Sequence, residues 1–73
     1  MAMTDLKWTD AEEIGFRLSE EFPGEDPLAV RFTNLRERIL ALDGFAGAPD
    51  ASTEGALEAI QMAWLEYFRE GQS

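Results

Sequence analysis

The chain has 73 residues, of which 15 are acidic and six are basic, so its formal net charge at pH 7 is -9. A chain of this length buries only about 60% of the surface that it exposes when unfolded, which allows one hydrophobic core and excludes a second. The negative charge repels nucleic-acid phosphates and anionic lipids, and it therefore argues against DNA, RNA and membranes as partners.

The first predicted helix lies between Thr9 and Pro23. Thr9 is followed three residues later by Glu12, which is the capping-box spacing at a helix start. A rotation of about 100° per residue then places five small or apolar residues on one stripe, which we expect to face the core. They are Ala11, Ile14, Gly15, Leu18 and Phe22. Pro23 and the following glycine end this helix.

A short irregular segment comes next. Asp26 precedes Pro27, and this pair is typical of a helix cap followed by proline at the first helical position. Residues 30–32 then add β-branched and aromatic character. We therefore expect one helical turn and, after it, a short extended segment.

The second predicted helix is short and is expected to begin with Thr33 as its cap. Leu35, Ile39 and Leu42 follow one another at helical spacing, and an Asp-Gly pair at 43–44 ends the helix. The loop at 44–51 consists mainly of Gly, Ala, Pro and Asp around Phe45, whose ring we expect to fix the loop to the core.

The third predicted helix begins with Ser52 as its cap and is the most strongly amphipathic segment. Its large apolar residues fall within about 100° of arc, so it should be the central core helix. They are Leu57, Ile60, Trp64, Tyr67 and Phe68. We expect both tryptophans, Trp8 and Trp64, to belong to the core.

One domain is expected over residues 5–69, with flexible termini at 1–4 and 70–73. The longest apolar run is far shorter than the roughly 20 residues that cross a bilayer. The first residues also lack the basic and apolar regions of a signal peptide, so we expect a cytoplasmic protein.

The residue types present argue against catalysis. The chain has no histidine and no cysteine, so the usual base and thiol of nucleophilic catalysis are missing, as are thiolate metal ligands. Paired carboxylates can act as acid and base only in a pocket that raises one pKa, and so small a domain has little room for one. We predict that the protein is not an enzyme.

The surplus of carboxylates is the main functional signal. Glu13 and Glu20 share a face of the first helix away from the core stripe, and Glu58 and Glu66 lie on the third helix opposite Trp64. Such a surface is either an electrostatic docking patch for a basic protein or a loose site for hard cations such as Mg, Ca, Mn or iron. The residues alone leave both interpretations open.

Three arginines, Arg31, Arg36 and Arg38, form the main basic group of the chain. The simpler interpretation is internal pairing with Asp26 or Glu37, which balances charge within an acidic surface. The alternative is a second, smaller contact surface.

Several short motifs taken together resemble the IscX family. They are Leu6-Lys7-Trp8-Thr9-Asp10, Asp26-Pro27, Val30-Arg31-Phe32-Thr33, Leu57-Glu58-Ala59-Ile60 and Trp64-Leu65. The resemblance runs without gaps from about Leu6 to Glu66. It implies a mainly α fold, namely a small three-helix, winged-helix-like domain with a short extended segment. It also implies a role in iron-sulfur cluster assembly, through binding of a cysteine desulfurase and weak binding of iron.

One segment departs from the family pattern, in which a run of acids follows the second helix. Here only Asp43 remains before Pro49, so we favour protein docking over iron storage or delivery. The predicted function is an acidic adaptor or regulator that binds the desulfurase through four glutamates: Glu13, Glu20, Glu58 and Glu66. No obligatory cofactor is expected, and weak iron binding would use Glu13, Glu20, Asp26 and Asp43. The alternative function is a generic acidic interaction domain or a nucleic-acid-mimicking antagonist of a basic protein. The oligomeric state is left open.

Overall fold

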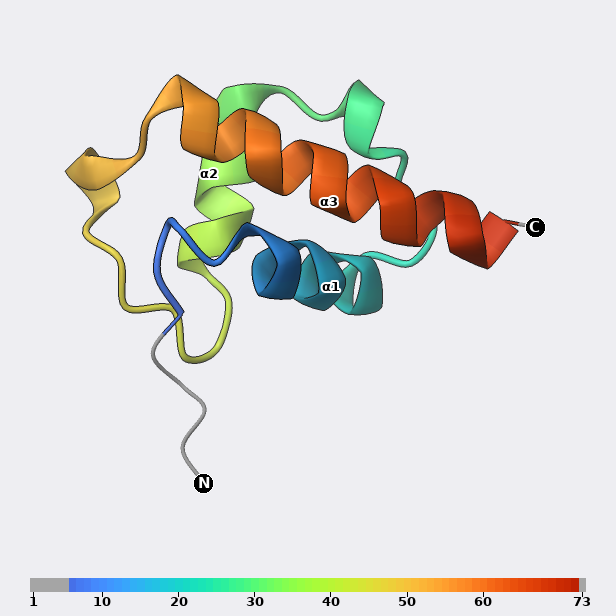
Figure 1. Ribbon diagram of the computed structural model, residues 1–73, viewed down its shortest axis with the longest axis horizontal. Coiled ribbons are helices and arrows are strands. Elements are labelled where there is room, and N and C mark those ends of the chain that lie inside the picture. The colour runs from blue at the N-terminus through green and yellow to red at the C-terminus, as the bar shows by residue number, and fades with distance from the viewer. Residues whose placement is uncertain (1–5, 73) are drawn as a thin grey trace.

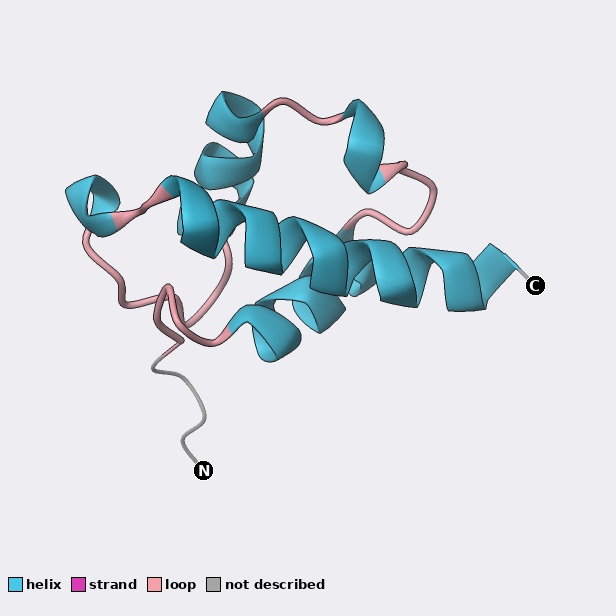
Figure 2. Cartoon of the chain, turned by 45° about the horizontal axis from the view of Figure 1, so that its top comes forward, coloured by secondary structure: helices cyan, strands magenta, loops and turns pink. Residues whose placement is uncertain are grey.

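The computed structural model describes residues 6–72, and its secondary structure is entirely helical (Figures 1 and 2). In chain order the elements are α1 (Ala11–Glu21), the 3-10 helix η1 (Pro27–Ala29), α2 (Phe32–Leu40), the 3-10 helix η2 (Pro49–Ala51) and α3 (Glu54–Gln72). This confirms the mainly α fold class. The expected flexible segment at 1–4 lies outside the described residues, and at the other end α3 continues beyond residue 69.

The longest helix, α3, runs across the molecule and contacts α1, η1 and α2. Its most extensive packing is against α1, which lies beside it in Figure 1. The side chains that are completely buried come from all three helices and from η1. They are Ile14, Leu18, Pro27, Leu35, Ile39, Ile60 and Trp64. The expectation that α3 is the central core helix is therefore confirmed.

The contact between α1 and α3 is close enough to require a glycine. A Cβ atom added at Gly15 would lie 2.7 Å from the Cβ of Ala63 and 2.7 Å from the backbone nitrogen of Trp64. Real Cβ atoms do not approach other atoms so closely. Gly15, which the apolar stripe placed toward the core, therefore sets the distance between the two helices.

The segment before α1 is held against the loop that follows α2. Leu6 donates its backbone N–H to the Gly44 carbonyl at 3.0 Å and forms an isolated parallel bridge with Phe45. The ring of Phe45 packs edge-on against Trp8, with ring centroids 4.7 Å apart, and the Trp8 indole N–H donates to the Ala48 carbonyl at 2.7 Å. These contacts confirm that Phe45 fixes the loop to the core. Trp8, which is 7% exposed, is confirmed as a core residue.

Two of the expected helix caps are wrong because a neighbouring residue takes the role. Asp10, rather than Thr9, is the N-cap of α1, since a turn in which Asp10 and Lys7 bond to each other delays the helix by one residue. Ser52 ends η2, so Thr53 caps α3 instead and accepts a hydrogen bond from the Ala56 backbone N–H at 3.1 Å.

The second helix also begins earlier than expected. Arg31 is the N-cap of α2, and Thr33 lies within the helix, because the extended backbone ends at Arg31. The helix ends at Leu40, before the Asp-Gly pair, and Gly44 adopts a φ of 84° in the turn that follows. The expected cap at Asp26 is confirmed, since its carboxylate accepts from the Leu28 backbone N–H at 3.0 Å.

The winged-helix features implied by the family resemblance are not confirmed. Val30 and Arg31 have extended backbone, as expected, but residues 6–72 contain no β-strand that would form a wing. None of the helices in this part of the chain combines the length and apolar character needed to span a bilayer.

Candidate protein-docking surface

The four glutamates predicted to bind a partner are all exposed. Glu13 and Glu20 lie on α1, and Glu58 and Glu66 lie on α3. None of them has a hydrogen bond or an ion pair within residues 6–72. Their carboxylates are therefore hydrated and available to a cationic surface.

The four glutamates do not lie on one flat face. Glu13 and Glu20 are seven residues apart, so they share a face of α1 about 10 Å apart along its axis. On α3, Glu66 lies about 160° around the helix from buried Trp64. Glu58 lies about 180° around α3 from Tyr67, the residue that contacts α1. The structure thus places Glu13, Glu20 and Glu66 on the outer surface of the paired helices and Glu58 on the flank away from α1.

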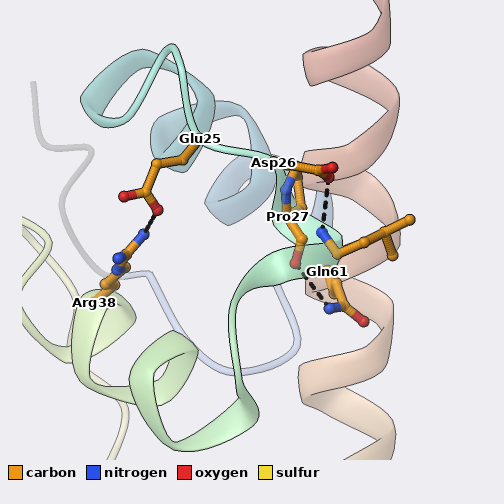
Figure 3. Close-up of polar contacts among 6 residues, drawn as sticks. Glu25, Asp26, Pro27, Arg38 and Gln61 are labelled. Carbon is orange, nitrogen blue, oxygen red and sulfur yellow. Dashed lines mark hydrogen bonds and ion pairs between the residues drawn. The ribbon is translucent and has the colours of Figure 1, made fainter.

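That flank of α3 faces η1. Gln61, one turn after Glu58, donates its side-chain amide to the Pro27 carbonyl at 3.0 Å (Figure 3). Glu58 and Gln61 also line a shallow hollow together with Met62, which is 54% exposed. Of the four predicted site residues, Glu58 is therefore the one that points furthest away from the contact between α1 and α3.

The seam between α1 and α3 carries a polar contact that the sequence did not indicate. The Tyr67 hydroxyl donates to the Glu12 carboxylate at 3.3 Å, and the Tyr67 ring meets Phe16 edge-on with ring centroids 5.4 Å apart. Desolvation raises the pKa of Tyr67 above its usual value of 10.0, and the nearby charges of Glu12, Glu70 and Glu13 raise it further. Tyr67 therefore lies within the electrostatic field of three carboxylates.

Sequence reasoning missed Phe16 and Glu12 as surface features and treated Tyr67 as a core residue, whereas Tyr67 is only half-buried. The signal for Phe16 was its position off the apolar stripe of the first helix, where an aromatic residue is 40% exposed. For Glu12 nothing in the sequence indicated a contact with Tyr67, and the capping box in which we expected this residue does not form.

The four acids proposed for weak iron binding do not converge. The Asp26 carboxylate is engaged in capping η1, and the backbone carbonyl of Asp43 accepts from Arg17 at 3.2 Å. Within residues 6–72 no three carboxylates gather closely enough to hold a metal ion. Glu13, Glu20, Asp26 and Asp43 therefore do not fit a resident metal centre.

The arginine group is largely engaged inside the molecule, although not with the expected acids. Arg38 forms an ion pair with Glu25 (Figure 3). It also lies over the Phe22 ring, with its guanidinium carbon 4.6 Å from the ring centroid. Arg36 donates to the Pro49 carbonyl at 3.3 Å. The expected pairing with Asp26 or Glu37 is wrong, because α2 packs with Arg38 facing the chain segment that follows α1. Arg31 has no such partner in the described part of the chain.

The fold and the exposed groups define a small acidic helical domain whose exposed charged side chains are mainly carboxylates. Residues 6–69 match the family model described as iron-sulphur cluster assembly. Over 61 residues the chain is 48% identical to an uncharacterized protein of Pseudomonas aeruginosa, an alignment that covers 84% of this chain and 92% of that protein. The chain belongs to the iron-sulphur cluster assembly family, which is the IscX family that its motifs resemble.

Proposed function

We propose that this protein is an acidic adaptor or regulator of iron-sulfur cluster assembly that binds a cysteine desulfurase through carboxylates of α1 and α3. The observation that carries the proposal is the lack of internal partners for Glu13, Glu20, Glu58 and Glu66 within the described residues. Membership of the family supports the role in cluster assembly. The desulfurase as partner follows from the resemblance to the IscX family.

The distribution of positive charge supports this proposal. Three of the six basic residues, namely Arg17, Arg36 and Arg38, bond to carbonyls or to a carboxylate and so connect separate segments of the domain. In the described part of the chain, none of the three forms an ion pair with Glu13, Glu20, Glu58 or Glu66. An acidic surface of this kind accelerates the encounter with a basic partner and sets its orientation, and its effect decreases as salt screens the charges.

Charge reversal tests the proposal. The double variant Glu13→Lys/Glu20→Lys should weaken binding to the desulfurase by about tenfold or more at low salt, because it replaces attraction by repulsion at the partner's basic surface. Glu66→Lys should have a smaller effect, and Glu58→Lys the smallest. Calorimetry at two salt concentrations measures the dissociation constants, and circular dichroism checks that each variant is folded.

The matched control is Glu37→Lys/Asp50→Lys, which makes the same change in charge on α2 and η2. At the higher salt concentration, which screens the change in net charge, this variant should bind the desulfurase nearly as well as the parent does. Equal losses in both double variants, or binding that does not respond to salt, would show that the outer surface of α1 and α3 is not the contact. Binding of an unrelated basic protein with equal affinity would favour a generic acidic interaction domain.

A further inference from the structure

An exposed aromatic pair lies at the seam between α1 and α3, where the two helices run side by side (Figure 1). Phe16 is 40% exposed, and its ring meets that of Tyr67 at 68° with the centroids 5.4 Å apart. The hydrogen bond from Tyr67 to Glu12 holds the second ring in place. The pair is therefore an apolar feature of the surface that lies close to the carboxylates of α1.

Two carboxylates of α1, Glu12 and Glu13, lie near this pair. Glu12 accepts a bond from the Tyr67 hydroxyl, and neither Glu12 nor Glu13 forms an ion pair within residues 6–72. Arg17, four residues after Glu13, is the natural helical partner of that glutamate. It donates instead to the Asp43 carbonyl at 3.2 Å. Glu12 and Glu13 thus lie beside two aromatic rings without a direct ion pair in this part of the chain.

Each ring also borders a hollow in the surface. One hollow, of about 440 Å³, is lined by Leu6, Glu13, Phe16 and Arg17. The other, of about 270 Å³, is lined by Ser19, Phe22, Pro23, Trp64, Tyr67, Phe68 and Gly71. A side chain that lies against the Phe16 ring therefore meets apolar Leu6 and the Glu13 carboxylate, with Arg17 at the edge of the hollow. The hollow beside Tyr67 offers apolar walls for methylene groups but no carboxylate in its lining, so there the charge would be met by Glu12, which is bonded to the Tyr67 hydroxyl.

We propose that Phe16 and Tyr67, together with Glu12 and Glu13, form a docking point for an arginine side chain on the basic surface of a protein partner. The proposal rests on the proposed function and specifies what the acidic surface recognises. A guanidinium is planar and weakly hydrated, so it stacks on an aromatic ring while its fork of N–H groups bonds to a carboxylate. A lysine ammonium is compact and strongly hydrated and gains less from such a site. The surface should therefore select arginine over lysine.

Two peptides of equal charge test this selectivity without the desulfurase. Blocked hexa-arginine should bind more tightly than blocked hexa-lysine, and the measured quantity is the arginine-to-lysine ratio of affinities, which is the dissociation constant for hexa-lysine divided by that for hexa-arginine. Because ordinary carboxylates also favour arginine, the decisive comparison is between variants. Phe16→Gln keeps the net charge and should reduce the arginine-to-lysine ratio by about three- to fivefold, which is the expected contribution of a surface cation–π contact.

The control variant is Leu28→Gln, which makes a similar change at a residue of η1 that is 58% exposed. It should leave the ratio unchanged. In the parent, NMR should show that hexa-arginine shifts the ring signals of Phe16 and Tyr67 more than hexa-lysine does. Tyr67→Phe, which keeps the ring but loses the bond to Glu12, should lower the ratio less than Phe16→Gln.

An unchanged ratio in folded Phe16→Gln, or ring signals that do not respond to hexa-arginine, would overturn the proposal. The two proposals can fail separately. If the peptides show the selectivity but the desulfurase does not bind, only the partner is wrong. If the desulfurase binds and the peptides show no selectivity that depends on Phe16, only the arginine docking point is wrong.

Discussion

Trp64 is completely buried, yet the N–H of its indole ring has no hydrogen-bond partner in the described part of the chain. Leaving such a donor unsatisfied costs about 1–3 kcal/mol. Trp8 differs, because its indole N–H donates to the Ala48 carbonyl. The two tryptophans therefore stabilise the domain in different ways, Trp64 by its volume alone and Trp8 by its volume and a hydrogen bond.

Two substitutions at Trp64 should separate the stabilisation that comes from its volume from the cost of its unsatisfied indole N–H. Trp64→Ala should lower the free energy of unfolding by about 3–5 kcal/mol, because it leaves a cavity at the centre of a domain that has one core. Trp64→Phe should cost clearly less, since it removes the unsatisfied N–H while it keeps an aromatic ring. Urea denaturation measures both changes. A Trp64→Ala variant that melts within a few degrees of the parent would contradict the burial of this residue.

The core residues were largely predictable from the sequence, whereas their polar neighbours were not. Ile14 and Leu18 are one helical turn apart on α1, as Ile60 and Trp64 are on α3, and this periodicity alone identifies the side of each helix that is buried. The bond between Tyr67 and Glu12 joins residues from opposite ends of the chain. Its formation depends on the rotation and distance of α1 relative to α3, which no local pattern contains.

At the scale of elements, α1 and α3 form the main unit of the fold, and Gly15 determines how closely they pack. Gly15→Ala improves the intrinsic helix propensity of α1 by up to about 1 kcal/mol. The added methyl group, however, would overlap the Ala63 side chain and the Trp64 backbone. The rigid backbone cannot move aside as a flexible side chain would.

We therefore expect Gly15→Ala to lower the free energy of unfolding by about 1–3 kcal/mol in spite of the better propensity, because the contact becomes overpacked. The matched control is Gly55→Ala in α3, where an added Cβ meets nothing within 4 Å. That variant should be neutral or slightly stabilising. Thermal unfolding of both variants is the measurement, and a stabilised Gly15→Ala variant would mean that the two helices can separate at little cost.

Helix existence was predictable from the sequence, but helix starts were less so. Thr9 and Asp10 are adjacent candidate caps, as are Ser52 and Thr53, and each pair offers two suitable side chains. The choice depends on the preceding turn. The turn that begins at Lys7 and the 3-10 helix η2 each occupy the first candidate, so the second one caps the helix.

On the scale of the whole molecule, the negative charge is spread over the surface rather than gathered at one point. The net charge of -9 is the balance of 15 acidic and six basic residues, and no three of the acids in residues 6–72 form a cluster suited to a metal ion. The sequence predicted the surplus and the exposure of Glu13, Glu20, Glu58 and Glu66. It did not predict that Glu58 lies apart from the others, because the sequence does not show which side of α3 packs against α1 and which side faces η1.

This arrangement leads to an expectation for iron. Carboxylates that stand singly or in pairs offer only oxygen ligands and impose no geometry, so they distinguish poorly between hard cations. Ferrous or ferric iron should therefore bind with a dissociation constant of roughly 10 μM or weaker, and Mg or Ca should displace it readily. Anaerobic calorimetry with ferrous iron, carried out with and without Mg, measures both properties. Glu13→Gln/Glu20→Gln should reduce the amount of iron bound, because both carboxylates are exposed and have no ion pair within residues 6–72, whereas Asp26→Asn should change it little, because that carboxylate caps η1. A tight, stoichiometric site that selects iron in the presence of Mg would contradict this expectation. It would show that the chain gathers its carboxylates around the ion on binding, and the acidic surface would then have to be regarded as an iron carrier rather than a surface for protein docking.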